Sequence, residues 1–456
     1  MRINATSGAI TLYAEAYGDG RDTTRRAEVT NVKTDNLLEQ ILCSENLNEA
    51  FLQVKRNKGA EGTDGMKVSE LGEHLKENGE TIKEQIRNRK YNPQPVRRVE
   101  IPKPDGGIRN LGVPTVTDRF IQQAVAQVLT PIYEEQFSNN SYGFRPGRCA
   151  EMAIIRCIEM MNDGYTWVVD IDLEKFFDNV NHDKLMNIIS RTIKDGDVIS
   201  LIRKFLVSGV MIDDEYKDTI IGTPQGGNLS PLLSNIMLNE FDKELEARGL
   251  NFVRYADDCI ILVKSEKSAN RVMDSITKFL QEALGLKVNI SKSKVDRPNG
   301  IKYLGFGFYW DTFSHQFKAK PHMKSIQKLK EKLKRITSRR WGVSIAHRIM
   351  KLKQLIVGWI NYFKIGQMKS ICIKLDEHIR FRLRICIWKQ WKKVKTKYES
   401  LMKLGIPKDK AWEWANTRKG FARVARSHIL HRAITKERLK KFGLVSLLDQ
   451  YQLVHI

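Results

Sequence analysis

The sequence predicts an α+β protein in which a mixed region of hairpins and helices is followed by an all-α, basic region. Apolar runs rich in β-branched residues flank short turns in residues 96–111 and 252–263, which is typical of antiparallel hairpins. Apolar residues recur at helical spacing from Leu37 to Val54 and again beyond Pro321. Beyond Pro321, Lys and Arg cover the outer faces of the expected helices.

Length and composition bound the class of protein. The chain has 456 residues, of which 41% are hydrophobic, and this is enough for two to four domains. No apolar run approaches the ~20 residues that span a bilayer, and the N-terminus has no basic-then-apolar signal peptide. The six cysteines form no CxxC pair, which argues against a zinc site or a disulfide framework. We therefore expect a cytoplasmic protein with no membrane partner.

The positive charge is concentrated in the last third of the chain. The formal net charge is +24, and residues 301–456 contain 37 Lys and Arg against 9 Asp and Glu. The preceding 300 residues carry a slight excess of acid, with 40 Lys and Arg against 44 Asp and Glu. Such a concentration is typical of nucleic-acid binding, and interleaved aromatic residues fit a polyanion better than an anionic membrane surface.

The first part of the chain is predicted to contain a tail, helices and a basic hairpin. Residues 1–34 show no apolar period, and we expect them to form a flexible tail. Order is expected to begin near Asp35, a plausible N-cap. Residues 96–111 are predicted to form two strands around a turn flanked by Lys103 and Arg109. Two cations on one hairpin suit a triphosphate, although a solvated basic turn has the same pattern.

Two adjacent carboxylates occupy the predicted turn of the hairpin at residues 252–263. Asp257 and Asp258 repel each other unless a cation or hydrogen-bond donors neutralise them. Hard divalent ions such as Mg²⁺ prefer oxygen ligands, and phosphoryl-transfer sites use pairs of these ions. The alternative is that residues 255–258 form an ordinary solvated turn without a metal ion.

A second acidic cluster follows a predicted buried strand that begins at Trp167. The strand ends in a cluster of acids and aromatic residues that extends to Asp178. A carboxylate at the end of a buried strand is well placed to hold a metal ion. Asp170, Asp172 and Asp178 cannot all be ligands, and the strand pattern alone leaves the choice open.

Several other segments have features suited to contact with nucleic acid. Residues 142–148 combine aromatic residues, Gly and Arg, and residues 222–231 form a turn-rich segment with Gln225 that opens an apolar helix. A plain loop before a helix is the alternative for the second segment. Residues 303–308 are an alternating strand whose glycines allow close backbone approach. The aromatic residues of the basic helices are, taken singly, more typical of a helical core than of a stacking platform.

Taken together, these segments resemble those of a bacterial group II intron-encoded reverse transcriptase and maturase. The resemblance runs from about Asp35 to the C-terminus, and the thumb signature at residues 358–363 separates the chain from retron-type and abortive-infection enzymes. No Cys/His cluster follows, so the resemblance is to the compact type without an endonuclease domain. The motifs that carry it, in chain order, lie at residues 101–109, 141–146, 172–178, 223–227, 255–258 and 303–305.

The resemblance implies a right-hand polymerase with fingers, a palm that contains an antiparallel sheet, and an all-α basic thumb. Fingers and palm would occupy residues 35–312, and the thumb or maturase domain residues 313–395. Residues 396–456 would form a small helical domain similar to DNA-binding domains, and residues 1–34 lie outside the resemblance.

The resemblance also implies the site residues. Asp172, Asp257 and Asp258 match the catalytic carboxylates that bind two Mg²⁺ ions, for which Mn²⁺ could substitute. Asp172 is chosen over Asp170 because the family places an aromatic residue five positions after its catalytic aspartate, and Phe177 fits. Phe177 would then exclude nucleotides with a ribose 2′-hydroxyl. The other nucleotide contacts would be Lys103, Arg109, Gln225 and Lys292, and the nucleic-acid contacts Arg145, Tyr303, Gly305, Trp359 and Tyr362.

Two functions follow as hypotheses from the resemblance. One is RNA-templated DNA synthesis for retrohoming, with dNTPs, an RNA template paired with a DNA primer, and target DNA as partners. The other is an RNA-binding splicing factor that stabilises its own group II intron. A domesticated or defence-associated reverse transcriptase without a splicing role is the alternative. The sequence leaves open whether the protein is a monomer or a homodimer.

Overall fold

The computed structural model describes residues 36–102, 106–212, 215–218, 221–223 and 226–455. The chain divides into two compact units, Met1–Arg297 and Pro298–Ile456. The first unit mixes helices and sheets, and the second is mainly helical, which confirms the predicted α+β class. The predicted tail at residues 1–34 lies outside the described residues. No helix within the described ranges has the length and apolarity needed to cross a membrane.

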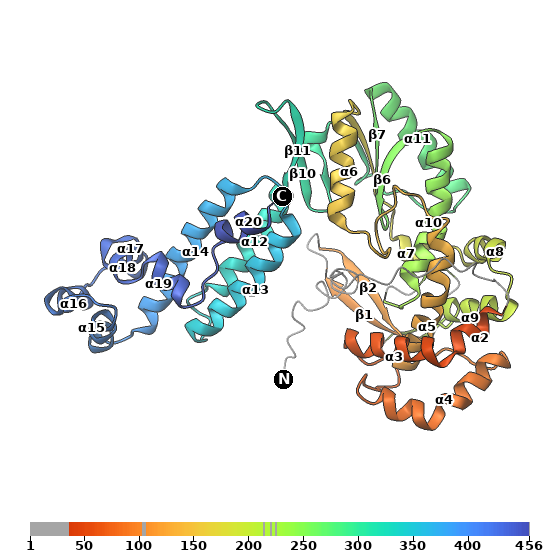
Figure 1. Cartoon of the computed structure of the whole chain (residues 1–456), viewed down its shortest axis with the longest axis horizontal. Helices are drawn as coiled ribbons and strands as arrows, with labels where there is room; N and C mark the ends of the chain where they lie inside the picture. Colours follow the sequence, from red (N-terminus) through yellow and green to blue (C-terminus); the bar gives the residue numbers. More distant parts are fainter. Residues whose placement is uncertain (1–35, 103–105, 213–214, 219–220, 224–225, 456) are drawn as a thin grey trace. The chain divides into compact units, whose positions relative to one another are not determined.

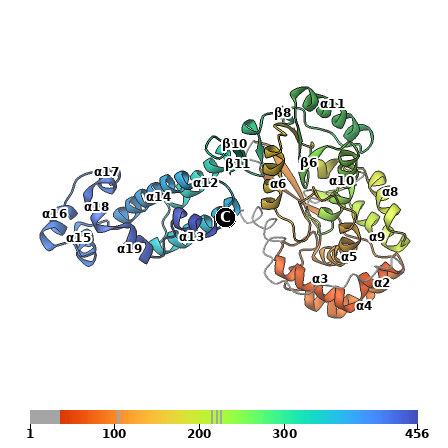
Figure 2. The same ribbon diagram turned by 45° about the horizontal axis from the view of Figure 1, so that its top comes forward.

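The first unit begins with helices that pack on one another through apolar faces. The first three of them lie away from the four-stranded sheet that contains β6 and β7, as Figure 1 and Figure 2 show. Thr115 caps the longest of them by accepting a hydrogen bond from the backbone N–H of Asp118 at 3.1 Å. These helices are α2 (Leu37–Leu42), α3 (Ser44–Asn57), α4 (Leu71–Arg87) and α5 (Val116–Glu134).

The predicted basic hairpin is present and belongs to a small sheet. Strands β1 (Val96–Pro102) and β2 (Ile108–Val113) pair antiparallel, and Arg109 lies opposite Ile101. β4 (Val210–Ile212) runs parallel to β1 and pairs with β5 (Glu215–Lys217). The turn residues 103–105 lie outside the described part of the chain.

A second sheet carries the two acidic segments of the first unit. Its strand order is β6-β7-β3-β8, and every neighbouring pair is antiparallel. Most of its apolar residues are buried, and Val169 and Ile261 are fully so. The strands are β3 (Trp167–Ile171), β6 (Asn251–Tyr255), β7 (Asp258–Val263) and β8 (Lys294–Asp296). The surrounding helices are α6 (Ala150–Asn162), α7 (Phe176–Asn179), α8 (His182–Thr192), α9 (Gly196–Leu206), α10 (Ser230–Ala247) and α11 (Glu266–Glu282).

The second unit starts with a short 3-10 turn, η1 (Pro298–Gly300), and a three-stranded sheet before its helices. The sheet contains β9 (Lys302–Tyr303), β10 (Phe306–Asp311) and β11 (Gln316–Pro321). Phe306 of β10 packs on Phe363 with ring centroids 4.8 Å apart, so this sheet shares a core with the following helices. The compact units therefore divide at Arg297, before the predicted limit at residue 312.

The remaining elements of the second unit are helices, as the pattern beyond Pro321 predicts. The long ones are α12 (Met323–Ile336), α13 (Ile345–Phe363) and α14 (Lys369–Gln390). Asp376 of α14 accepts hydrogen bonds from the backbone N–H groups of Leu447 and Leu448, which joins the last helix to α14. The short helices are α15 (Val394–Lys403), α16 (Lys408–Ala415), α17 (Phe421–Arg426), α18 (His428–Ala433), α19 (Lys436–Lys441) and α20 (Leu447–Val454).

Candidate active site

Three aspartates lie at one end of the sheet β6-β7-β3-β8. Ala256 and Asp257 form the two-residue turn between β6 and β7, while Asp258 is the first residue of β7. β3 pairs with β7 so that Ile171 lies opposite Cys259. Continuing this antiparallel register by one residue places Asp172 opposite Asp258. The backbone of Asp172 is held from the other side, because its N–H donates to Ser293 Oγ at 3.0 Å.

The electrostatics of Asp257 show that these carboxylates influence each other. Burial is the largest cause that raises the pKa of Asp257 above its usual value, and its own backbone N–H opposes this. The negative charge of Asp172 raises the pKa further, while the positive charges of Arg109 and Arg254 lower it. Two half-buried carboxylates that repel each other are stabilised when a cation is added between them.

The donor chemistry of the three aspartates fits a hard divalent cation. Carboxylate oxygens are the ligands that such ions prefer, and the negative charge is concentrated at the turn. Within the described ranges, however, no group of three or more His, Cys, Asp or Glu side chains is gathered closely enough to hold a metal ion. The fit to a divalent cation therefore rests on the chemistry of the three carboxylates and on their positions in the sheet.

The two neighbouring acids that the sequence left open have different surroundings. Asp170 lies within β3, opposite Ile260 of β7 and Lys294 of β8. Asp178 is exposed in the first turn of α7. Neither residue lies at the register position next to Asp258, which favours Asp172 as the partner of the hairpin carboxylates.

Phe177 is half-buried in α7, and its backbone is held by the segment 221–223. Its ring packs edge-on against Phe176 at 5.3 Å, and its carbonyl accepts from the N–H of Thr223 at 2.7 Å. Gly222 has a φ of 101°, and a Cβ there would lie 3.0 Å from the carbonyl oxygens of Phe177 and Asp178. A cavity of about 290 Å³ opens beside Phe177, and β1 and β2 contribute to its lining.

The predicted nucleotide contacts are described only in part. Arg109 is exposed on β2, and its charge lowers the pKa of Asp257, so the hairpin β1–β2 and the aspartates belong to one electrostatic environment. Lys292 is exposed in the turn before β8, where its N–H donates to Asn289 O at 3.1 Å. Lys103 and Gln225 lie outside the described residues.

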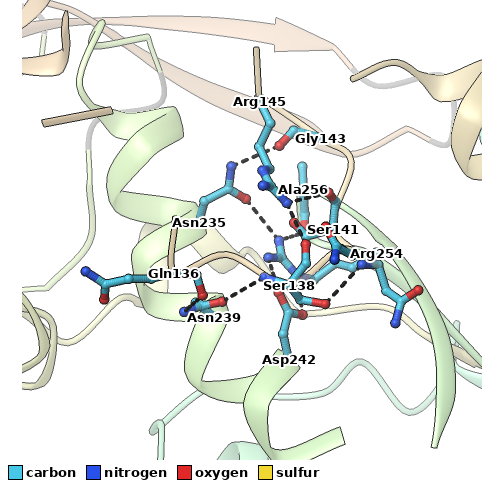
Figure 3. A network of polar contacts seen from close by, with 12 residues as sticks. Gln136, Ser138, Ser141, Gly143, Arg145, Asn235, Asn239, Asp242, Arg254 and Ala256 are labelled. Atoms are coloured by element: carbon cyan, nitrogen blue, oxygen red, sulfur yellow. Dashed lines mark hydrogen bonds and ion pairs between the residues drawn. The ribbon is translucent and has the colours of Figure 1, made fainter. Parts of the chain in front are cut away.

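Arg145 has a structural role that does not fit its predicted contact with nucleic acid. Its side chain is 3% exposed. Its guanidinium donates to Glu134 at 2.9 Å and to the carbonyl oxygens of Ser138 and Ser141 at 2.5 and 2.9 Å. The guanidinium is buried and hydrogen-bonded to these partners, so Arg145 stabilises its own loop and does not face a nucleic-acid strand (Figure 3).

Sequence reasoning missed a second buried arginine beside the turn. Arg254 of β6 is fully buried and forms a two-point ion pair with Asp242 of α10, at 2.7 and 2.5 Å. Burial raises the pKa of Asp242, and the charge of Arg254 lowers it. The sequence did contain a sign of this ion pair. An arginine among the apolar residues of a predicted buried strand indicates a partner of opposite charge, since a buried charge requires one.

The predicted contacts of the second unit gather where β9 and β10 meet α13. Tyr303 is 2% exposed, so its side chain is part of the core, and the predicted contact with nucleic acid does not fit this burial. Gly305 has a φ of 84°, and a Cβ there would lie 3.3 Å from the ring of Phe363. Tyr362 is 43% exposed and donates to Leu304 O at 2.9 Å. The ring of Trp359 contacts the same Phe363 in a tilted arrangement, with ring centroids 4.8 Å apart. Trp359 and Tyr362 remain predicted contacts.

Comparisons with known families match both units. A family model described as "Reverse transcriptase (RNA-dependent DNA polymerase)" matches residues 101–308. A second model, described as "Group II intron, maturase-specific domain", matches residues 326–405. The first range includes all three aspartates, and the second includes Trp359 and Tyr362.

Individual relatives include two proteins that are described as products of introns. Protein YkfC of Escherichia coli (strain K12) is 33% identical over 316 residues, which cover 60% of this chain and 83% of that protein. The group II intron-encoded protein LtrA of Lactococcus lactis subsp. cremoris is 39% identical over 212 residues, 46% of this chain and 35% of that protein. The putative COX1/OXI3 intron 2 protein of Saccharomyces cerevisiae is 31% identical over 56% of this chain and 37% of that protein. The chain thus spans only about a third of the last two relatives.

Proposed function

We propose, since this chain belongs to the family of group II intron reverse transcriptases with a maturase-specific domain, that it copies RNA into DNA and assists the splicing of its intron. The observation that carries the first activity is the arrangement of Asp172, Asp257 and Asp258. Asp172 directly follows β3 and lies opposite Asp258 of β7 by register, and Asp257 precedes Asp258 in the turn. Asp172 is close enough to raise the pKa of Asp257.

The proposed roles of the chain's own residues follow from this arrangement. Asp172 and Asp257 hold a pair of divalent cations, and Asp258 assists them. Bound Mg²⁺, or Mn²⁺ in its place, would supply the Lewis acidity that lowers the pKa of the primer 3′-hydroxyl and neutralises the pyrophosphate. Arg109 and Lys103 bind the triphosphate through charge-assisted hydrogen bonds. Phe177 excludes nucleotides that carry a 2′-hydroxyl, and Gln225 and Lys292 contact the incoming nucleotide.

The second activity rests on the maturase-specific match at residues 326–405 and on the charge of the same region. Residues 301–456 carry 37 Lys and Arg against 9 Asp and Glu, which suits the backbone of a folded RNA. Splicing needs this surface and no chemistry at the aspartates. The partners we propose are therefore the intron RNA, an RNA template with a DNA primer, target DNA and dNTPs, in the cytoplasm of a bacterium.

One double variant separates the two activities. Asp257→Asn with Asp258→Asn keeps the shape of the side chains but removes the charge that would hold cations. We expect primer extension on poly(rA)/oligo(dT) with Mg²⁺ to fall by about a thousandfold or more, which corresponds to ~4 kcal/mol of transition-state stabilisation. Splicing of the cognate intron at low Mg²⁺ should persist. Asp274→Asn, on the exposed face of α11, is the matched control and should leave both activities unchanged.

Each possible outcome has a clear meaning. Primer extension by the double variant at the wild-type rate would show that these aspartates are not the site. Loss of splicing in a folded double variant would contradict two independent activities. A domesticated or defence-associated enzyme would show primer extension but no splicing, and the genomic sequence around the gene would contain no group II intron RNA.

A further inference from the structure

Arg254 makes a set of contacts that reaches the turn between β6 and β7. Besides its ion pair with Asp242, its guanidinium donates to Ala256 O at 2.9 Å and to Asn235 Oδ1 at 3.0 Å. Ala256 precedes Asp257 and has a φ of 57°. A residue other than glycine pays about 1–2 kcal/mol for this left-handed conformation, so the surrounding contacts must hold it there.

Asn235 and Gly143 support the same turn from the other side. Asn235 is buried on α10 and donates to Gly143 O at 2.9 Å while it accepts from Arg254. Gly143 lies against the turn so closely that a Cβ there would be 2.2 Å from Ala256 N. Figure 3 shows Arg254, Asn235, Gly143 and Ala256 in one network. The backbone of Ala256 thus lies between the guanidinium of Arg254 and Gly143, where there is no space for a side chain.

We propose that Arg254 is a positioning residue for the catalytic aspartates, and that Asn235 transmits its constraint to the loop around Gly143. The contact with Ala256 O fixes the turn peptide, and this fixes the direction in which Asp257 leaves the backbone toward Asp172. The proposal rests on the proposed function, because it takes the aspartates to be the cation ligands. A purely structural ion pair would need only Asp242, and such pairs add little stability compared with apolar side chains of the same size.

The test measures cation binding without turnover. Mn²⁺ is titrated by electron paramagnetic resonance into the full chain bound to an RNA template with a dideoxy-terminated DNA primer. Arg254→Lys keeps the charge next to Asp242 but loses the planar fork that reaches Ala256 O and Asn235. Asn235→Ser is a milder variant that removes the link between Arg254 and Gly143 O. Thermal unfolding of each variant is recorded in parallel.

Matched controls come from the same network. Arg145→Lys alters an equally buried arginine, whose partners are Glu134 and the carbonyls of residues 138 and 141. Asn239→Ser alters a buried asparagine one helical turn beyond Asn235, and Asn239 donates to Gln136 O at 3.1 Å. None of the hydrogen bonds named for these controls involves the turn residues 255–258, so they report the cost of disturbing the network elsewhere.

We expect Arg254→Lys and Asn235→Ser to weaken Mn²⁺ binding by about tenfold, the usual effect of losing a group that orients a metal ligand. Arg145→Lys and Asn239→Ser should lower the unfolding temperature but leave Mn²⁺ binding within about twofold. Unchanged Mn²⁺ binding in folded Arg254→Lys or Asn235→Ser, or an equal loss in the controls, would overturn the positioning role. Asp257→Asn is the separate arm for the proposed function: if it binds Mn²⁺ as the wild type does, the aspartates are not the ligands.

Discussion

Arg145 and Arg254 are both almost fully buried, and each donates hydrogen bonds to a carboxylate and to backbone carbonyl groups. Guanidinium groups suit this role because they stay charged and present several donors in a fixed plane. A buried charge is costly without its partners. Arg145 therefore holds the loop at 138–145, and Arg254 holds the turn between β6 and β7.

The burial of Arg145 leads to a prediction at the scale of a single residue. Arg145→Ala leaves Glu134 and two carbonyl groups without their donor, and we expect the free energy of unfolding to fall by about 3–5 kcal/mol. The affinity of the remaining folded protein for RNA should not change, because the guanidinium does not reach the surface. Denaturant unfolding and RNA binding at low temperature measure the two quantities.

The matched control for this residue is Arg156→Ala, which removes a surface ion pair with Glu159. We expect it to change the free energy of unfolding by about 0.5 kcal/mol or less. A loss of RNA affinity in folded Arg145→Ala, with no such loss in Arg156→Ala, would restore Arg145 as a nucleic-acid contact.

At the scale of elements, the short helix α7 that carries Phe177 and the residues after it are held by the separate segment 221–223. Asn181 and Ile221 form an isolated β-bridge, and Gly222 N donates to Val180 O at 2.9 Å. His182, buried at the start of α8, lies with Nε2 2.5 Å from Gly222 O. The backbone of residues 177–182 is thus clamped at several points, and the clamp determines where the ring of Phe177 stands.

These contacts predict what happens when a methyl group is added at Gly222. Gly222→Ala adds a Cβ 3.0 Å from the carbonyl oxygens of Phe177 and Asp178, so the loop must shift. We expect discrimination between dNTPs and rNTPs to fall by about tenfold, since a small displacement of a positioning group has a large effect on rate. Steady-state incorporation of a dNTP and the matching rNTP measures this ratio.

Gly249→Ala is the control, because it introduces the left-handed backbone strain without a steric clash. Gly249 has a φ of 65°, and a Cβ there would meet nothing within 4 Å. Both variants should lose about 1–2 kcal/mol of stability from the left-handed conformation. An equal change in sugar discrimination, or no change in either variant, would show that Gly222 does not act through Phe177.

At the scale of the whole molecule, the separation of charge between the two units predicts how RNA binding responds to salt. Lys328, Lys332 and Arg335 are exposed on α12. We expect their joint replacement by Gln to reduce the slope of log affinity against log salt by about 2–3, because each lost phosphate contact removes ~0.7–0.9 from it. Filter binding of the intron RNA between low and physiological salt measures this slope.

The control for the salt effect takes three exposed cations from the first unit. Lys267, Arg271 and Lys278 lie on α11, in the part of the chain that has no excess of positive charge. Their replacement by Gln should leave the slope unchanged. An equal reduction in the two triple variants would mean that RNA is attracted by the overall charge and not by the second unit.

Local patterns in the sequence were enough to predict several elements of this protein, although the single strand expected at residues 303–308 is wrong. These residues form the turn between β9 and β10 with the strand ends on either side. The β-branched runs around Asp257, the hairpin at β1–β2 and the basic helices beyond Pro321 were all predicted, because periodicity and turn residues act over a few positions. The family was also predicted from the order of its motifs. Among the described residues, these features could be predicted without knowing which segments are in contact in the folded protein.

Only the tertiary structure decided which side chains are accessible and which carboxylates meet. Arg145 and Tyr303 were predicted to be surface contacts, but both are buried. Glu134 of α5 pairs with Arg145, and Tyr303 pairs with Phe306 in a sheet that packs on Phe363 of α13. The position of Asp172 next to Asp258 depends on the register between β3 and β7, which are almost ninety residues apart. Burial and register are properties of long-range packing, and a local pattern carries no information about either.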